Sequence, residues 1–136
     1  MSFLLDVNVL VAWGWEDHVD HERTVRWIAG QKKKRGVELW TSPIPEIGFV
    51  RVSVQRGLGH VSVGEAAEVL RSMLESLGGR HRFLPDNVDG ATWPEWCTRG
   101  SQTTDAHLVR LAEQHGLELA TLDVEISGAV LLPTGG

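Results

Sequence analysis

Apolar residues recur in five short runs along the chain, separated by longer segments with helical spacing. The runs are FLLD (3–6), VELWT (37–41), HRFLP (81–85), LELATLD (117–123) and AVLLP (129–133). Short apolar runs of this kind are typical of buried strands. Because they alternate with helical segments, they predict an α/β fold: a three-layer α/β/α arrangement around a central, mainly parallel sheet of four to five strands.

The segments after the first and second runs carry helix signals. A helix is predicted over residues 7–15, and another begins near Asp20, an N-cap candidate, and ends at Gly36. After the second run, Pro45 suits the first position of a helix. The apolar residues expected to share one helix face are Val25, Ile28 and Ala29 in the second helix and Ile47, Val50 and Val54 in the third.

Two further helices precede the fourth run. Ser62 and Glu65 form a capping-box pattern at the start of SVGEAAEVLRSMLESLGG (62–79), the clearest helix of the chain. The helix DAHLVRLAEQHG (105–116) is expected to be capped by Thr103 or Thr104. Residues 86–102 between them show no sustained period, which predicts a loop with a broken helix.

Composition narrows the class of protein. The 136 residues suit one compact domain, and no stretch is long and apolar enough to predict a membrane span. No basic region precedes the first apolar run, so we do not expect a secretory signal. Cys97 is the single cysteine, which excludes an internal disulfide and suits a cytoplasmic location. The net charge of -5 excludes a globally basic nucleic-acid binder.

Four carboxylates occupy related places in this outline. Asp6 and Asp123 end the first and fourth strands, whereas Glu46 and Asp105 stand in first turns of helices. Ligands of open parallel sheets bind at the carboxyl ends of the strands, so Asp6, Glu46 and Asp123 should meet there. Asp105 should join them if the irregular segment before its helix crosses the sheet edge.

Four neighbouring carboxylates repel one another, and a bound divalent cation offsets this repulsion between their negative charges. Mg²⁺ and Mn²⁺ prefer oxygen ligands and sites of a few carboxylates completed by water. Asn8, Thr104 and Thr121 lie near these acids in sequence and could orient them by hydrogen bonds. The sequence therefore predicts a Mg²⁺ or Mn²⁺ site.

These residues stand in motifs that resemble those of the PIN-domain nucleases, and within them the VapC-type toxins of bacterial toxin–antitoxin pairs. The matching stretches are LLDVNVLVAW, TSPIPEIGFVRVSV, HRFLPDN and QTTDAHLVRLAEQHGLELATLD, in the order and spacing of the family. The resemblance covers nearly the whole chain and implies a single PIN-like domain over residues 1–136.

The resemblance implies a Mg²⁺- or Mn²⁺-dependent endoribonuclease that cuts structured RNA such as tRNA and inhibits translation and growth. Asp6, Glu46, Asp105 and Asp123 match the acidic quartet of the family, and Asn8 matches the polar position after the first aspartate. It also implies a small VapB-type antitoxin that blocks the site, a homodimer, and no membrane association.

Other residues could modify this site. Arg51 follows Glu46 on its helix and could contact an RNA phosphate, as could the basic run Lys32–Arg35. Glu125 stands where some relatives have a further aspartate, and His107 where relatives often have a tyrosine.

Two other classes of protein compete with a nuclease. A receiver-type domain would need a lysine late in the chain, but the last lysine is Lys34. The remaining alternative is a non-catalytic binding module of the same fold that sequesters a protein partner.

Overall fold

The computed structural model describes residues 1–134. Its five strands form one sheet in the order β3-β2-β1-β4-β5, and every pairing is parallel. The strands are β1 (Phe3–Leu5), β2 (Leu39–Thr41), β3 (His81–Phe83), β4 (Glu118–Thr121) and β5 (Val130–Leu131). All five predicted strands are confirmed, and their carboxyl ends meet at one edge.

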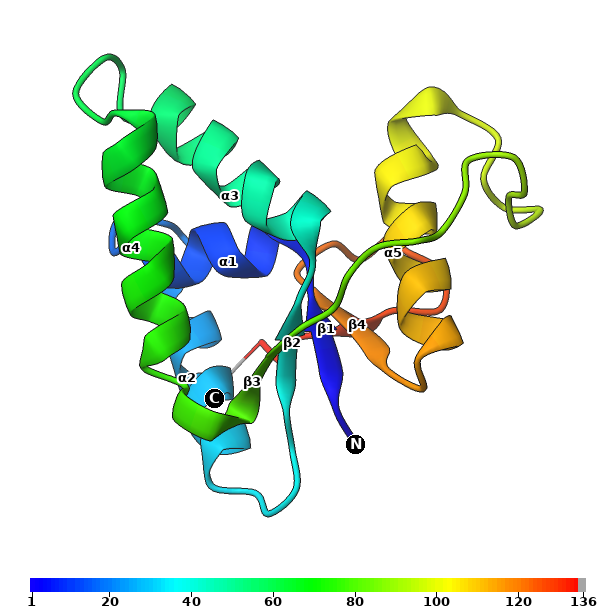
Figure 1. The fold of residues 1–136 in the computed structure, drawn as a ribbon, viewed down its shortest axis with the longest axis horizontal. Helices are drawn as coiled ribbons and strands as arrows, with labels where there is room; N and C mark the ends of the chain where they lie inside the picture. Colours follow the sequence, from blue (N-terminus) through cyan, green and yellow to red (C-terminus); the bar gives the residue numbers. More distant parts are fainter. Residues whose placement is uncertain (135–136) are drawn as a thin grey trace.

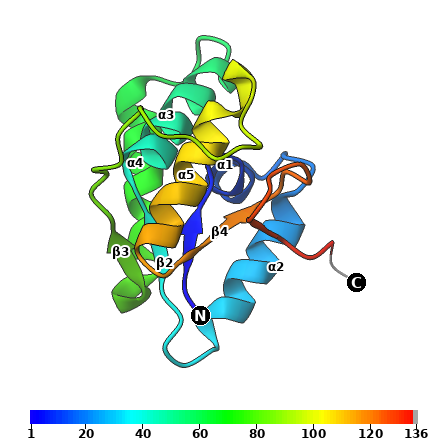
Figure 2. The same cartoon turned by 90° about the vertical axis from the view of Figure 1, so that its right-hand side faces the viewer.

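Helices cover both faces of this sheet, so the three-layer α/β/α arrangement is confirmed. α1 (Val7–Gly14), α2 (His21–Lys32), α3 (Pro43–Arg56) and α4 (Val63–Glu75) lie on one side, and α5 (Thr103–Gln114) lies on the other (Figures 1 and 2). Short 3-10 helices occupy Gly78–Arg80 and Gly100–Gln102. In residues 1–134, none of the helices is both long enough and apolar enough to cross a membrane.

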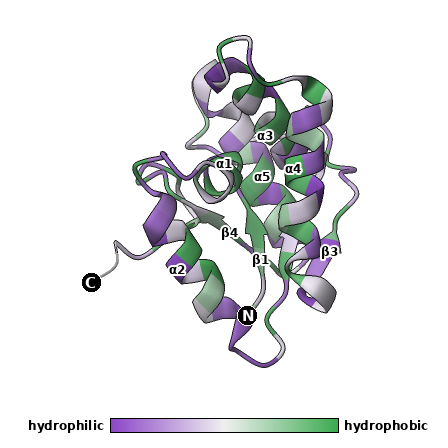
Figure 3. Ribbon diagram, turned by 90° about the vertical axis from the view of Figure 1, so that its left-hand side faces the viewer, coloured by the Kyte–Doolittle hydropathy of each residue, from purple (hydrophilic) through white to green (hydrophobic). Residues whose placement is uncertain are grey.

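The side chains of the sheet divide between two cores because successive residues of a strand point to opposite faces. Leu5 and Leu39 pack with α1 and α2, whereas Leu4 and Leu119 pack with α5. In Figure 3, β1 and α1 are coloured as apolar, whereas α2 and α4 alternate apolar and hydrophilic residues. The two cores fix the helices that carry the predicted site residues.

The faces predicted for two helices differ in part from the faces that pack on the sheet: Ile28 of α2 is buried as expected, whereas Ile47, Val50 and Val54 of α3 share a face that lines a surface groove. α2 buries Thr24, Trp27, Ile28 and Gln31, and leaves Val25 40% exposed. α3 buries Pro45, Gly48, Phe49 and Ser53, and leaves Ile47 63% exposed. In both helices a small or polar residue sits in the buried row, so the apolar period alone does not identify the face that packs on the sheet.

The starts of α3 and α5 also differ from the prediction. α3 begins at Pro43, so Pro45 stands at its third position, where it has no N–H to give the N-cap residue Ser42. The buried Ser42 hydroxyl therefore has no hydrogen-bond partner among the described residues. Thr103 lies inside α5, because the 3-10 helix before it continues directly into α5 and places Gln102 at the cap.

Candidate metal site

Asp6 joins the end of β1 to the start of α1. Its side chain is 4% exposed, accepts a hydrogen bond from Val7 N at 2.7 Å as the N-cap of α1, and accepts a second from Thr121 Oγ1 at 2.8 Å. Burial nevertheless raises the pKa of Asp6, and the charge of Asp123 adds to this effect. The apolar strand thus holds a carboxylate whose ionised form is under-solvated.

Asn8 and Thr121 connect the start of α1 to the end of β4. Asn8 Oδ1 accepts from Leu122 N at 3.1 Å, and Asn8 Nδ2 donates to Thr121 Oγ1 at 3.2 Å. The same hydroxyl accepts from Asp123 N at 3.0 Å while it donates to Asp6. Thr121 thus bonds directly to the Asp6 carboxylate and to the backbone of Asp123, whereas Asn8 bonds to Thr121 and Leu122 and contacts neither carboxylate.

Asp105 reaches the same edge from the opposite face of the sheet. The segment after β3 runs over the sheet edge, and α5 then begins above the carboxyl ends of the strands (Figure 1). Partial burial, together with the charges of Asp6 and Asp123, raises the pKa of Asp105 to about 6. Mutual repulsion of this kind shows that the three aspartates lie near one another.

Glu46 is placed differently from the three aspartates. Its Oε2 accepts a hydrogen bond from Thr41 Oγ1 at 2.6 Å, and His81 Nε2 lies 2.7 Å from the same hydroxyl. Glu46 is not among the charges that raise the pKa of Asp6 or Asp105. The structure therefore brings together three of the four predicted acids and turns the fourth toward β2 and β3.

The sequence analysis did not single out Thr41 or His81. His81 opens β3 opposite Leu39, and Thr41 lies two residues after Leu39 on β2. Residues two apart on a strand share a face, so the register places both side chains on the same side of the sheet. A search for histidine pairs at zinc spacing misses such a contact, because it joins different strands.

The remaining candidates lie at the margin of the site or away from it. Arg51 is exposed on α3, and Thr104 is exposed at the start of α5. Glu125 contributes its backbone N–H to Asp123 Oδ1 at 2.9 Å, and His107 Nε2 contacts Asp86 Oδ2 at 2.5 Å, tying α5 to the loop after β3. Lys32 ends α2 and Lys33–Arg35 lie in the turn before β2, at the sheet edge opposite the aspartates.

The donor set suits a hard divalent cation. Three carboxylates and the hydroxyl and amide groups around them offer oxygen ligands only, which is the set that Mg²⁺ and Mn²⁺ prefer. In residues 1–134, no three His, Cys, Asp or Glu side chains already enclose a metal position. Binding would therefore need side-chain rotation, for which the half-exposed Asp105 has room, and water to complete the coordination.

Replacement of Asp105 by Asn should stabilise the metal-free protein above pH 6 by about 1 kcal/mol, a value reduced from that of the full pKa shift because solvent screens a half-exposed group. The pKa of Asp105 is about 6 in the folded chain, against an ordinary value of 3.8. Between pH 3.8 and pH 6 the folded chain therefore retains a proton on Asp105 that the unfolded chain has lost. Stability of the metal-free protein therefore falls as pH rises through this window, and the variant should lack that fall.

Urea unfolding in EDTA at pH 4, 5, 6 and 7.5 measures this effect. Glu95→Gln, in the exposed loop before α5, serves as the control and should follow the parent protein. Equal pH dependence of the parent and Asp105→Asn would show that the three carboxylates do not repel one another.

Comparison with known proteins agrees with the fold. Residues 3–129 match the PIN domain, so the chain belongs to the PIN-domain family. It is 38% identical over 133 residues to Ribonuclease VapC39 of Mycobacterium tuberculosis, covering 93% of this chain and 92% of that one. Within the PIN-domain family, the chain thus belongs to the VapC group.

Two further relatives support this assignment. Ribonuclease VapC38 of Mycobacterium tuberculosis is 37% identical over 126 residues, covering 90% of this chain and 86% of that protein. Ribonuclease VapC29 of the same organism is 33% identical over 140 residues, covering 98% of both chains. The similarity extends over most of the length of both chains in each case.

Proposed function

We propose that this chain is a divalent-metal-dependent endoribonuclease and the toxin of a toxin–antitoxin pair. It hydrolyses phosphodiester bonds in structured RNA such as tRNA, and thereby inhibits translation and growth in the cytoplasm. The observation that carries the proposal is the meeting of Asp6, Asp105 and Asp123 at the carboxyl edge of a parallel sheet. The names of the relatives, all ribonucleases, support the choice of RNA.

The residues of the site would have different roles in hydrolysis. Asp6, Asp105 and Asp123 would hold Mg²⁺ or Mn²⁺, which supplies positive charge for the scissile phosphate when bound. Glu46 orients the attacking water through the carboxylate oxygen that Thr41 leaves free. Arg51, exposed on the same helix, contacts a phosphate of the RNA. The products carry 5′-phosphate and 3′-hydroxyl ends.

Metal removal tests this function. In EDTA the purified chain should leave RNA intact, and Mg²⁺ or Mn²⁺ added in excess should restore cleavage. Sequencing of RNA ends after induction in cells identifies the target and the chemistry of the cut. Equal cleavage with and without EDTA would contradict metal dependence, and intact cellular RNA after induction would favour a binding module instead.

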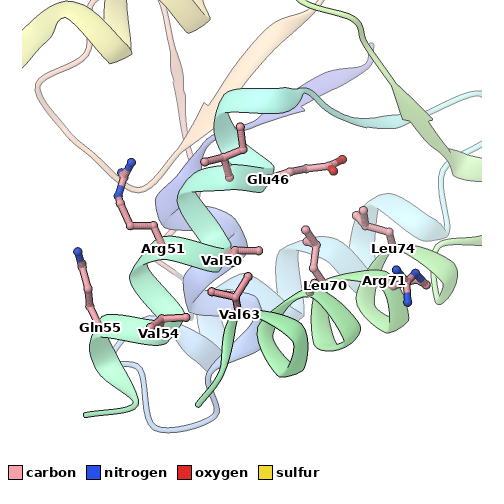
Figure 4. A pocket seen from close by; sticks show the side chains of 11 residues that line it. Glu46, Val50, Arg51, Val54, Gln55, Val63, Leu70, Arg71 and Leu74 are labelled. Carbon is pink, nitrogen blue, oxygen red and sulfur yellow. The ribbon is translucent and has the colours of Figure 1, made fainter. Parts of the chain in front are cut away.

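An apolar groove between α3 and α4 is the feature that indicates a protein partner. It has a volume of about 790 Å³, with charged residues at its margins, and opens between the two helices (Figure 4). Its apolar lining comprises Ile47, Val50, Val54, Val63, Ala67, Leu70 and Leu74. Ile47 and Val63 are each 63% exposed, which is unusual for large apolar side chains that line one groove.

We assign this groove to an amphipathic helix of a VapB-type antitoxin, because an apolar stripe between two helices suits the apolar face of a third. Glu46 lies at one end of the groove, so a partner seated there would also reach the metal site. The toxin itself is a homodimer. Size-exclusion chromatography of the chain alone, and with the product of an adjacent small reading frame, tests both associations.

A further inference from the structure

Three side chains from three different elements form a hydrogen-bonded row at Glu46, the fourth predicted acid. His81 opens β3, Thr41 ends β2, and Glu46 lies in the first turn of α3. His81 Nε2 is 2.7 Å from Thr41 Oγ1, and Thr41 Oγ1 is 2.6 Å from Glu46 Oε2. Both contacts are within the range of strong hydrogen bonds, and the hydroxyl is shared between them.

The chemistry of the hydroxyl fixes the direction of both bonds. Thr41 has one proton to donate, and the ionised carboxylate of Glu46 can only accept it. At the other contact the hydroxyl must therefore accept, so His81 Nε2 must carry the proton. Thr41 is fully buried, so water has no access to replace either partner. The row requires the Nε2–H form of His81.

The backbone is held in place on both sides of the row, which limits the hydrogen-bond partners that the Glu46 carboxylate can reach. α3 starts with prolines at its first and third positions, which fix the local backbone, and Glu46 N is bonded to Ser42 O at 3.2 Å. On the strand side, parallel pairing of β2 with β3 sets Thr41 and His81 on one face. The bond to Thr41 then occupies Oε2 and leaves Oε1 free.

We propose that Thr41 and His81 are positioning residues that orient Glu46 for RNA cleavage. His81 fixes the rotation of the Thr41 hydroxyl, and Thr41 in turn fixes the plane of the Glu46 carboxylate and leaves Oε1 as the oxygen that can accept from the reacting water. Neither Thr41 nor His81 contacts RNA. The kinetic part of this inference rests on the proposed ribonuclease function, whereas the hydrogen-bonded row itself does not.

Matched substitutions test the kinetic part. Thr41→Val removes the hydroxyl and Thr41→Ser retains it; His81→Leu removes the donor and His81→Gln retains an N–H at the position of Nε2. We expect kcat to fall about tenfold in Thr41→Val and His81→Leu, as for loss of one hydrogen bond to a charged group. KM should change less than about twofold, and the two retaining variants should recover most of kcat.

The same substitution made in a Glu46→Ala protein distinguishes a positioning role of Thr41 from a general effect on the fold. In Glu46→Ala, addition of Thr41→Val should cost no further kcat, because the residue that Thr41 orients is already absent. A further tenfold loss in that background, or an unchanged kcat in Thr41→Val alone, would overturn the positioning role.

Nitrogen NMR of His81 tests the row without any cleavage assay. The metal-free parent protein should show His81 in the Nε2–H form at pH 7.5. In Glu46→Ala the freed hydroxyl can donate to Nε2, so the Nδ1–H form should rise. An Nδ1–H form in the parent protein, or identical His81 signals in both, would overturn the row. If the parent protein did not cleave RNA, the ribonuclease function would be overturned. The NMR measurement alone would then decide whether the hydrogen-bonded row exists.

Discussion

Replacement of Asp6 by Asn should reduce RNA cleavage at least about 100-fold and leave the metal-free protein as stable as before or more stable. The loss should exceed the 10- to 100-fold typical of groups that only orient a metal ligand, because Asp6 itself would supply a ligand oxygen in the proposed site. The stability follows from burial, which raises the pKa of Asp6 and so disfavours its charged form. Asparagine keeps one oxygen, which can accept from Val7 N, and the Thr121 hydroxyl that donates to the other oxygen of Asp6 can donate to Asn8 Oδ1 instead.

Cleavage of a labelled tRNA with excess Mg²⁺, and urea unfolding in EDTA at pH 7.5, measure the two effects. Asp17→Asn is the matched control, because the Asp17 side chain is 74% exposed and pairs with Arg56 away from the site. The control should cleave within twofold of the parent. A clear loss of metal-free stability in Asp6→Asn would show that the carboxylate is required by the fold, and retained cleavage would remove Asp6 from the mechanism.

The second large effect concerns the crossing of α1 and α3. Gly48→Ala should lower the free energy of unfolding by about 2 kcal/mol, because its Cβ would lie 2.7 Å and 2.9 Å from the two methyl groups of Val7. Val7 is β-branched and cannot move its methyl groups away by a simple rotation. Chemical denaturation monitored by tryptophan fluorescence would measure the loss.

Gly30→Ala is the matched control for this substitution. Gly30 lies in α2, and a Cβ there would have no neighbour within 4 Å. Alanine should therefore stabilise that helix by about 0.5–1 kcal/mol through its higher helix propensity. If both substitutions stabilised the protein, close packing of α1 on α3 would not explain the glycine at position 48.

The strands were predictable because they are short apolar runs with clear breaks on both sides. The packing faces of α2 and α3 were not, because Thr24 and Ser53 are polar yet buried against neighbours from other parts of the chain. The exposed apolar residues of α3 point into the groove instead of the sheet core. Periodicity identifies an apolar face, but cannot distinguish a face that packs on the sheet from one that a partner covers.

The places of Asp6 and Asp123 were predictable from topology, since parallel strands end at one edge, whereas that of Asp105 depended on whether the irregular segment before α5 crosses the sheet edge. The orientation of Glu46 was not predictable, because it depends on a hydroxyl on β2 and an imidazole on β3. Those contacts follow from strand order and register, which local sequence does not specify. Placement of residues along the chain thus located the site, and cross-strand contacts determined how its side chains point.

The bond between Asp6 and Thr121 joins residues 115 positions apart. During synthesis the first strand leaves the ribosome long before the fourth exists, so a nascent chain cannot bring the aspartates together. The order of synthesis thus delays the nuclease until translation is nearly complete.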